Sequence, residues 1–449
     1  MNEIDLIGII PTIINNGRSE ATRIINGNNI EFNIEKINTH LAHEYSNLLY
    51  KGDNIKAMKD LLDNGYRSSI DLIYIDPPFY SNSNYTHRIE LRDEGKKKAI
   101  ETFAYSDTWD KGIKDYLEML TVRLFLMKEL LSDQGTIYIH LDYRTVHYVK
   151  IIMDCIFTME NFLNEIIWAY KSGGTSKKYF SRKHDNILVY TKSKNYIFNP
   201  QKEKSYNRDY KPYRFKNVKE YEDKLGWYTL VNLKDVWQIN MVGRTSRERV
   251  GYRTQKPESL LERIILSSSR EESIVADFFG GSGTTAVVAQ KNNRRWISTD
   301  LGNISTSIMR KRLADISKES YIIKNMDKFN LEKRLSFDLE EKIDGGSLSL
   351  RIKLKDYRID LHDVKLSKKE AEKLDEIVKK DSLCLIDYIG IGYFLDKNVI
   401  NIEFEELRRP ERLTIDNEFE IEIDPIRSKE MVLRIVDVFG HEYLQKLYN

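Results

Sequence analysis

Short hydrophobic runs and segments of helical periodicity alternate along the first third of the chain. The apolar runs at 47–50, 70–76 and 136–142 have the length and composition of buried strands. Between them, 55–62 and 116–131 carry apolar residues at the i, i+3 and i+4 positions of an amphipathic helix. This alternation of strand and helix predicts a parallel α/β sheet.

The same alternation returns later in the chain. We predict a helix over 257–269, a strand over 273–278, a glycine turn over 280–283, a helix over 284–291 and a strand over 296–299. Two stretches with one rhythm indicate a single doubly wound, Rossmann-like α/β core, which is interrupted between them.

The remaining segments lack this rhythm. The N-terminal residues carry weak patterns to which we assign no role, and the interruption is basic, aromatic and rich in loops. After about residue 320, short β-like runs and one helix near 368–379 predict a β-rich C-terminal appendage. We therefore divide the chain into an N-terminal segment, a first core part, an insertion, a second core part and an appendage, at 1–45, 46–167, 168–252, 253–318 and 319–449.

Four adjacent residues, Asp76-Pro77-Pro78-Phe79, directly follow one predicted strand. The exocyclic amine of a base is a poor nucleophile, because its lone pair is delocalised into the ring, and acceptors for both N–H groups free that lone pair. Asp76 can supply a carboxylate, Pro77 a carbonyl aimed by the rigid Pro-Pro turn, and Phe79 a ring that stacks on the base. The motif indicates methylation of a base amine, although the same residues can also simply end a strand.

A second motif joins a strand to a helix through a glycine turn and suits a nucleotide. Asp300 ends the next strand, at a spacing that suits hydrogen bonds to ribose hydroxyls. A dinucleotide-dependent oxidoreductase has a similar turn, but Asp277 would repel a pyrophosphate and suits the cationic amino end of S-adenosylmethionine. The motif consists of Asp277, Phe278, Phe279, Gly280, Gly281, Ser282, Gly283 and Thr284.

With both motifs present, the chain resembles the β class of site-specific DNA amino-methyltransferases, and in particular the modification subunits of Type III restriction systems. As in that class, the base-binding motif precedes the glycine motif and the target-recognition region lies between them. Phe278 departs from the family, where Pro is usual, and Phe79 stands where Tyr is commoner. The stretches that carry the resemblance are 47–62, 71–85, 103–109, 135–142, 254–257, 277–286 and 294–300.

The resemblance implies a methyltransferase that moves a methyl group from S-adenosylmethionine to the N6 amine of an adenine flipped out of duplex DNA. Asp at position 76, rather than Ser, is more similar to the adenine members than to the cytosine members. On the family pattern, Asp76, Pro77, Pro78 and Phe79 act on the base. The cofactor would contact Asp53, Lys256, Asp300 and the residues from Asp277 to Thr284.

The charge distribution favours DNA as the substrate. Residues 171–219 hold 14 lysines and arginines but only three acidic residues, interleaved with aromatic side chains. A charge run is often only a solvated face, and the charged stretch 88–98 is interpreted that way in preference to a mobile loop over the DNA. We expect the DNA contacts to include Lys171, Lys177, Lys178, Arg182, Lys183, Arg244, Arg247 and Arg249.

The composition bounds the remaining choices. The two cysteines, Cys155 and Cys384, are far apart and are expected to be buried thiols, so we predict no metal site and a cytoplasmic setting. No apolar run reaches the length that a membrane span needs. An RNA methyltransferase of the same fold and a recognition subunit for a nuclease stay open, as do a homodimer and a restriction-subunit partner.

Overall fold

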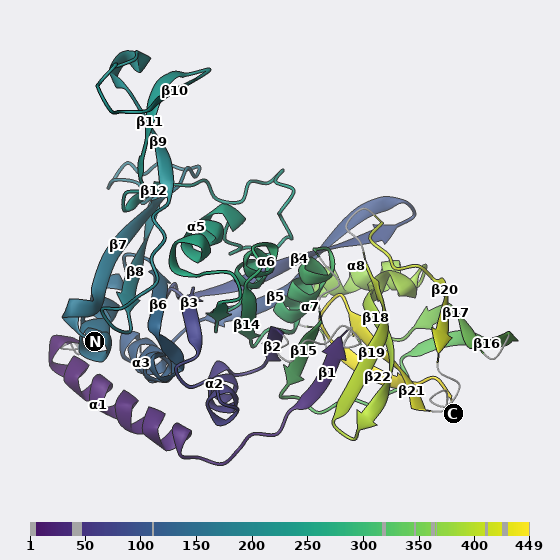
Figure 1. Ribbon diagram of the computed structural model, residues 1–449. Coiled ribbons are helices and arrows are strands. Elements are labelled where there is room, and N and C mark those ends of the chain that lie inside the picture. Colours follow the sequence, from purple (N-terminus) through teal and green to yellow (C-terminus); the bar gives the residue numbers. More distant parts are fainter. Residues whose placement is uncertain are drawn as a thin grey trace.

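The computed structural model describes residues 6–37, 47–109, 112–316, 320–344, 347–360, 364, 366–408, 412–423 and 430–448 (Figure 1). Its centre is one mixed sheet, whose strands run in the order β12-β7-β8-β6-β3-β13-β14-β2-β15-β1-β19-β18-β21-β22. Helices cover both faces of the part of this sheet that was predicted as the core.

Five neighbouring strands at the middle of the sheet are parallel. They are β6 (Leu131–Leu141), β3 (Ile70–Ile75), β13 (Ile274–Asp277), β14 (Arg295–Asp300) and β2 (Asn47–Lys51). Strand β13 comes late in the sequence but lies between β3 and β14, so both predicted core parts contribute to one sheet. The prediction of a parallel α/β core is confirmed.

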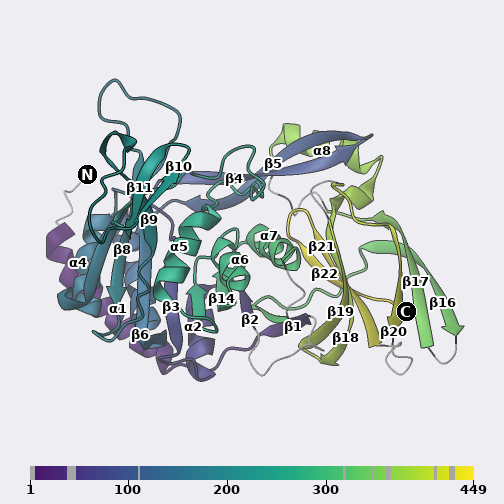
Figure 2. The ribbon, with the colours of Figure 1, turned by 45° about the horizontal axis from the view of Figure 1, so that its top comes forward.

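The helices form two layers (Figure 2). One layer is α1 (Leu6–Ile25), α2 (Asn54–Asp63), α3 (Ile113–Leu130) and α4 (Val146–Phe157). The other is α5 (Glu258–Ser268), α6 (Thr284–Lys291) and α7 (Asn303–Ala314). The apolar stripe of α3 is typical, since Leu117, Leu120 and Leu124 are all buried. Burial of each such leucine stabilises the fold by roughly 1.5–3 kcal/mol. Because helices cover both faces of the parallel sheet, the predicted doubly wound arrangement is confirmed.

The N-terminal segment has a structural role that the sequence did not reveal. Helix α1 packs on α3, and β1 (Asn33–Ile37) pairs with β15 (Tyr321–Asn325) on one side and β19 (Val399–Leu407) on the other. Because β15 also pairs with β2, the sheet runs without a break from the core into the C-terminal region.

The C-terminal region is rich in strands, as predicted. Helix α8 (Lys368–Val378), which is the predicted helix, and a small second sheet lie outside the main sheet. The main sheet holds β18 (Ile386–Asp396), β21 (Met431–Asp437) and β22 (Glu442–Lys446), while β16 (Leu335–Asp344), β17 (Ser347–Tyr357) and β20 (Glu418–Ile423) form a second sheet.

The charged stretch 88–98 is not a surface excursion. It belongs to a hairpin of β4 (Ser83–Asp93) and β5 (Lys96–Asp107), with positive φ angles at Glu94 and Gly95 in its turn. Ile89, Leu91 and Ile100 are buried in the core of the C-terminal region. The sequence did not reveal that these apolar residues are buried, because charged residues stand between them at every second position.

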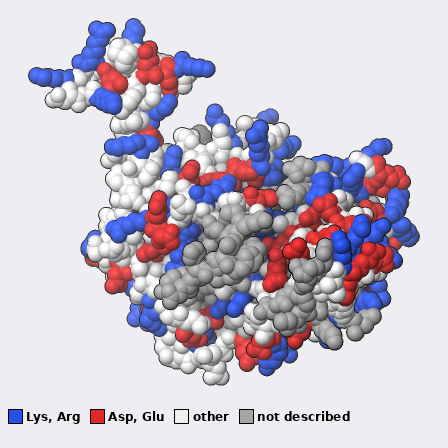
Figure 3. Space-filling view, turned by 45° about the vertical axis from the view of Figure 1, so that its right-hand side comes forward, with Lys and Arg blue, Asp and Glu red and all other residues white. Residues whose placement is uncertain are grey.

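The predicted insertion combines core and peripheral strands. Strand β8 (His184–Thr191) lies inside the main sheet, between β6 and β7 (Phe162–Ala169), and β12 (Val236–Gln238) pairs with β7 at the edge. A separate three-stranded sheet projects from the body, and Figure 3 shows lysine and arginine side chains around its outer end. This projecting sheet is β9 (Lys202–Tyr206), β10 (Glu220–Asp223) and β11 (Gly226–Asn232).

Three compositional expectations can be compared with the structure. Cys384 is buried as expected, whereas Cys155 on α4 is exposed, which corrects the prediction for that thiol. Among the described residues, no helix is both long and apolar enough to cross a bilayer. Within the same residues, no cluster of histidine, cysteine and acidic side chains is suited to hold a metal ion.

Candidate active site

The two predicted motifs meet at one edge of the sheet. Strands β3 and β13 are parallel neighbours, so Asp76 and Asp277 lie together at their carboxyl ends. A cavity of about 810 Å³ opens there. Gly283, the N-cap residue of α6, is the one predicted base or cofactor residue that does not line it. The cavity is lined by Asp53, Asp76, Pro77, Pro78, Phe79, Lys256, Asp277, Phe278, Phe279, Gly280, Gly281, Ser282, Thr284 and Asp300.

The carboxylate of Asp76 has two unlike oxygens. Oδ2 accepts a hydrogen bond from the ammonium group of Lys256, which comes from the loop before α5. Oδ1 is buried and has no hydrogen-bond partner among the described residues. The same ammonium group lies 5.2 Å from the centre of the Phe79 ring. A buried acceptor without a partner is costly, so Oδ1 is suited to a donor that a ligand brings.

A buried hydrogen-bonded chain lies behind the Phe79 ring. The hydroxyl of Tyr74 is 2.9 Å from Nδ1 of His140, and Nε2 of His140 is 3.3 Å from Asp185. The ring centres of His140 and Phe79 are 5.7 Å apart. His140 lies in the interior, where it supports Phe79.

The glycine turn is tied to Asp300. The backbone N–H of Gly281 donates to Oδ2 of Asp300 at 2.8 Å, and that of Gly302 donates to Oδ1 at 2.8 Å. Gly281 and Gly283 have φ angles of 52° and 76°, which favour glycine. Burial raises the pKa of Asp300. This acid is thus fixed at the cavity wall with further lone pairs for a ligand.

Asp277 is a buried acid with few donors. Thr285 donates to Oδ2 at 2.6 Å and the backbone N–H of Phe279 donates to Oδ1 at 2.9 Å. Burial raises the pKa of Asp277 to about 7, and the negative charges of Asp76 and Asp300 act in the same direction. A cationic ligand would suit this carboxyl group, because a nearby positive charge favours the ionised form that burial disfavours.

A third strand end completes the floor. Asp53 caps α2 by accepting from the N–H of Ile55 at 2.7 Å. The next residue, Asn54, donates to the carbonyl of Phe278 at 2.8 Å and accepts from Arg123 at 2.6 Å. The sequence did not single out Asn54 or Arg123, which link the start of α2 to the glycine motif.

The predicted DNA contacts fall in two places, away from this cavity. The loop between β7 and β8 carries Lys171, Lys177 and Lys178, which are exposed. In the same loop, Arg182 stacks on Tyr143, 3.9 Å from its ring centre, and Lys183 donates to carbonyls of the loop itself. The structure thus separates three lysines that face solvent from two basic residues that hold the loop.

The second place is a larger cavity of about 1310 Å³, which residues of the hairpin also line. Arg244, Arg247 and Arg249 all line it, and Arg88 of β4 lines it as well. The sequence gave no sign that residues of the hairpin would line the same cavity as these arginines.

A family model described as DNA methylase matches residues 70–309, more than half of the chain. The chain belongs to the N6/N4 DNA methylase family. S-adenosylmethionine is the methyl donor of this family, in agreement with the cofactor predicted from the two motifs. The family includes enzymes for adenine N6 and for cytosine N4, so membership leaves the base open.

Several curated DNA methyltransferases are similar to this member of the family. The Type II methyltransferase M.HpaI of Haemophilus parainfluenzae is 31% identical over 58% of this chain and 71% of its own length. M.EcaI of Enterobacter cloacae is 34% identical over 33% of this chain, and the EcoP15I Mod subunit of Escherichia coli is 27% identical over 34%. The matches span only 29% and 26% of those two relatives.

Solved structures of DNA methyltransferases also align with this family member. The complex of M1.HpyAVI with S-adenosylmethionine aligns over 59% of this chain and 98% of that chain, with 18% identity and a TM-score of 0.39. The cytosine-N4-specific PvuII DNA methyltransferase aligns over 64% and 93%, with 16% identity and a TM-score of 0.41.

Proposed function

We propose that this protein is a site-specific DNA methyltransferase that modifies the N6 amine of adenine in duplex DNA. The observation that carries the proposal is Oδ1 of Asp76, a buried acceptor with no partner in the described chain. Asp76 lines the cavity that Asp277 and Asp300 also line. One cavity thus offers an acceptor for a base amine beside groups suited to the cofactor.

The residues of the glycine motif fit S-adenosylmethionine. Asp277 suits the cationic amino end, because a neighbouring positive charge stabilises a carboxylate that burial disfavours. Asp300 suits the ribose hydroxyls, and Asp53, Phe278, Phe279 and the turn from Gly280 to Thr284 suit the rest of the molecule. When bound, the cofactor supplies an electrophilic methyl group on its sulfonium sulfur.

The residues of the first motif act on the base. Asp76 and the carbonyl of Pro77, aimed by Pro78, accept hydrogen bonds from the two N–H groups of the amine, which makes its lone pair available. Phe79 stacks on the flipped base. The amine nitrogen would gain the methyl group as the bond between that group and the sulfonium sulfur breaks, and it would then lose one proton to solvent. Asp at position 76 supports adenine over cytosine. We assign Lys256 the role of orienting Asp76, because it donates to Oδ2.

The basic residues bind the DNA backbone. Lys171, Lys177 and Lys178 are exposed, and they neutralise phosphates from the loop between β7 and β8, which Arg182 and Lys183 hold in shape. Arg244, Arg247 and Arg249 contact the backbone from the second cavity. The likeness to Mod subunits of Type III restriction-modification enzymes supports a role in such a system in the cytoplasm, beside a restriction subunit.

A methyl-transfer assay tests the proposal. Purified protein is incubated with labelled S-adenosylmethionine and unmethylated bacterial DNA, and the DNA is digested to nucleosides. We expect label in N6-methyladenine, and none with Asp76→Ala at unchanged thermal stability and DNA affinity. Label in N4-methylcytosine would overturn the base assignment. Transfer to RNA but not DNA would overturn the substrate, and activity of Asp76→Ala near the wild-type level would overturn the site.

A further inference from the structure

The C-terminal region forms part of the wall of the active-site cavity. The turn 438–441 joins β21 to β22, and its residues Phe439 and His441 line the cavity, together with Val364. These residues lie far along the chain from both motifs. Neither the family match nor the sequence motifs assign them a role.

The turn packs against the segment that directly follows Asp300. A Cβ atom added to Gly440 would lie 2.6 Å from the carbonyl carbon of Asn303 and 2.9 Å from its oxygen. Asn303 is the first residue of α7, and Leu301 and Gly302 before it line the same cavity. The turn is therefore next to the Asp300 end of the cavity.

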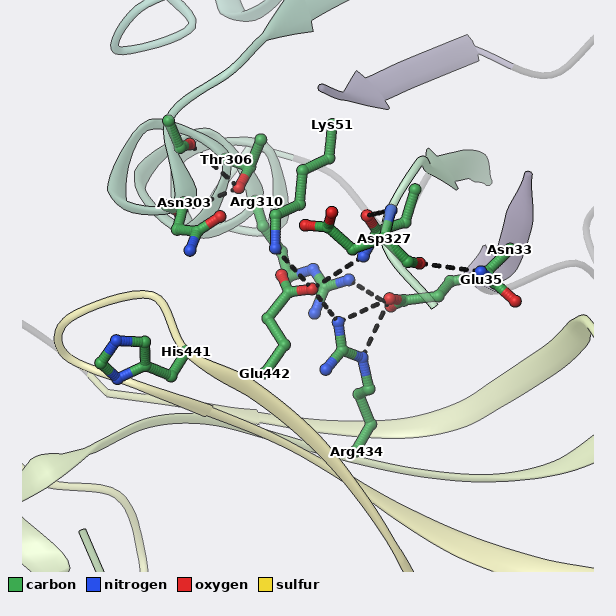
Figure 4. A network of polar contacts seen from close by, with 12 residues as sticks. Asn33, Glu35, Lys51, Asn303, Thr306, Arg310, Asp327, Arg434, His441 and Glu442 are labelled. Carbon is green, nitrogen blue, oxygen red and sulfur yellow. Dashed lines mark hydrogen bonds and ion pairs between the residues drawn. The ribbon is translucent and has the colours of Figure 1, made fainter. Parts of the chain in front are cut away.

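Buried charges hold the turn in place. Glu442, directly after the turn, pairs with Arg434 at 2.6 Å and with Lys51 of β2 at 2.8 Å. Figure 4 shows both cations pointing at its carboxylate, beside the loop that carries His441. Because Lys51 belongs to a core strand, this cluster ties the turn directly to the core.

Asp437 organises the turn from within. Its Oδ1 accepts from the backbone N–H groups of Phe439 at 2.9 Å and His441 at 3.0 Å. Its Oδ2 lies 3.0 Å from Nδ1 of His441. The turn is thus preorganised, and an ordered wall binds a ligand at a smaller entropic cost than a loose one.

We infer that the turn 438–441 is the outer wall of the adenosine half of the cofactor site. The inference rests on the proposed function, which puts the ribose at Asp300 and the amino end at Asp277. A purine next to Asp300 then meets Phe439, whose ring offers apolar surface, and His441, which offers a polar edge. The C-terminal region thereby completes the cofactor site in addition to any role toward DNA.

Isothermal titration of the full-length protein tests this inference. The probes are S-adenosylmethionine and 5′-methylthioadenosine, which keeps the adenosine but lacks the amino-acid end. We expect Phe439→Ala and His441→Ala each to weaken both probes by about tenfold, a change of about 1.4 kcal/mol, and to leave duplex DNA affinity unchanged. Loss of DNA affinity with unchanged binding of both probes would overturn the inference.

Matched controls separate the wall from general effects on folding. Phe419→Ala removes an aromatic ring that stacks on Phe404 in the same region, and His147→Ala removes an exposed histidine of α4. Neither residue lines the cavity, so both variants should bind the probes as the wild type does. Phe439→Leu keeps the apolar volume in case Phe439→Ala does not fold, and it should lose less affinity than His441→Ala.

One further variant distinguishes this inference from the proposed function. Asp277→Asn should weaken S-adenosylmethionine but leave 5′-methylthioadenosine unaffected, since that probe lacks the cationic end. If Asp277→Asn binds both probes normally, the proposed cofactor placement is wrong. If Asp277→Asn behaves as expected but the variants of Phe439 and His441 bind both probes as the wild type does, only the inference about the turn is wrong.

Discussion

Glu35 of β1 accepts two hydrogen bonds from Arg434 of β21, at 2.9 and 2.7 Å, although the residues are 399 positions apart. The other carboxylate oxygen accepts from Arg310 of α7 at 2.5 Å. All three side chains are buried, so each charge depends on the others (Figure 4). Since β1 lies between β15 and β19, this cluster sits where the core meets the C-terminal strands.

We predict that Glu35→Ala lowers the free energy of unfolding by about 3–5 kcal/mol, because it removes the carboxylate paired with the buried Arg310 and one of the two carboxylates paired with the buried Arg434. Chemical denaturation measures the loss. The control, Glu20→Ala, removes an exposed pair with Arg23 and should cost at most about 1 kcal/mol. Equal losses for the two variants would show that the buried cluster contributes little.

The pH dependence of this contribution has a definite sign. Burial raises the pKa of Glu35, but the charges of Arg434 and Arg310 outweigh burial and hold the pKa below its usual 4.5. A lowered carboxyl pKa stabilises the fold above the unfolded-state pKa, and this stabilisation is lost as the pH falls below it. The difference between wild type and Glu35→Ala should therefore shrink when denaturation is repeated in acid.

A variant of Lys256 can show which of two roles this residue has in the active site. If it orients Asp76, as its hydrogen bond indicates, Lys256→Met should lower kcat by at least about tenfold and change the affinity for S-adenosylmethionine by less than about twofold. If it binds the cofactor, as the family pattern implied, affinity should fall instead and kcat should be kept. Single-turnover kinetics and calorimetry on the same variant decide between the roles.

The chain behind Phe79 gives a test of stability. His140→Phe leaves the buried hydroxyl of Tyr74 without a partner, so we expect a loss of about 1–3 kcal/mol. Adding Tyr74→Phe removes the stranded hydroxyl and should restore part of that loss. A double-mutant cycle by denaturation measures the coupling, and strict additivity would show that the Tyr74–His140 bond contributes nothing.

Patterns in the sequence predict those structural features that depend on residues close to one another in the chain. The run 70–76 and the four residues from Asp76 to Phe79 predicted both a strand and its site, because a buried parallel strand is apolar throughout and its chemistry follows at once. Glu35 gave no such signal. A buried acid is recognisable only from its partners, which the topology brings from distant strands.

The cavity walls were less predictable than its floor for the same reason. The glycine motif and Asp300 come from successive strand ends, so local spacing brought them together in the prediction. Phe439 and His441 reach the cavity only because β1 extends the sheet into the C-terminal region. The sequence around Phe439 and His441 gives no sign that β1 pairs with a C-terminal strand.

Cofactor affinity should depend on pH through Asp277. Burial raises its pKa from 3.8 to about 7, so the folded protein without ligand is stabilised by protonation and loses stability as the pH rises between those values. The cationic end of S-adenosylmethionine requires the ionised form. Affinity should therefore increase as the pH rises through about 7 and level off above it.

Calorimetry in buffers of different ionisation enthalpy checks this directly, since binding below pH 7 should release a proton to the buffer. Asp277→Asn cannot release that proton, so its weaker affinity should not vary with pH over the same range. A pH profile of Asp277→Asn that matches the wild type would assign the titration to another group.

The loop between β7 and β8 separates electrostatic contacts from structural ones. Lys177 and Lys178 are exposed, whereas the ammonium group of Lys183 donates at 2.9 and 2.8 Å to the carbonyls of Ser172 and Gly173. Lys177→Ala and Lys178→Ala should each weaken binding to any duplex and reduce the slope of log K against log salt by about 0.9.

Fluorescence anisotropy with a labelled duplex at several salt concentrations measures that slope. Lys397→Ala, an exposed lysine in the acidic C-terminal region, is the matched control and should leave the slope unchanged. Lys183→Ala should lower affinity by releasing the loop, and its slope should change less than those of the two exposed lysines. Were the slope of Lys177→Ala the same as that of Lys397→Ala, Lys177 would not contact a phosphate.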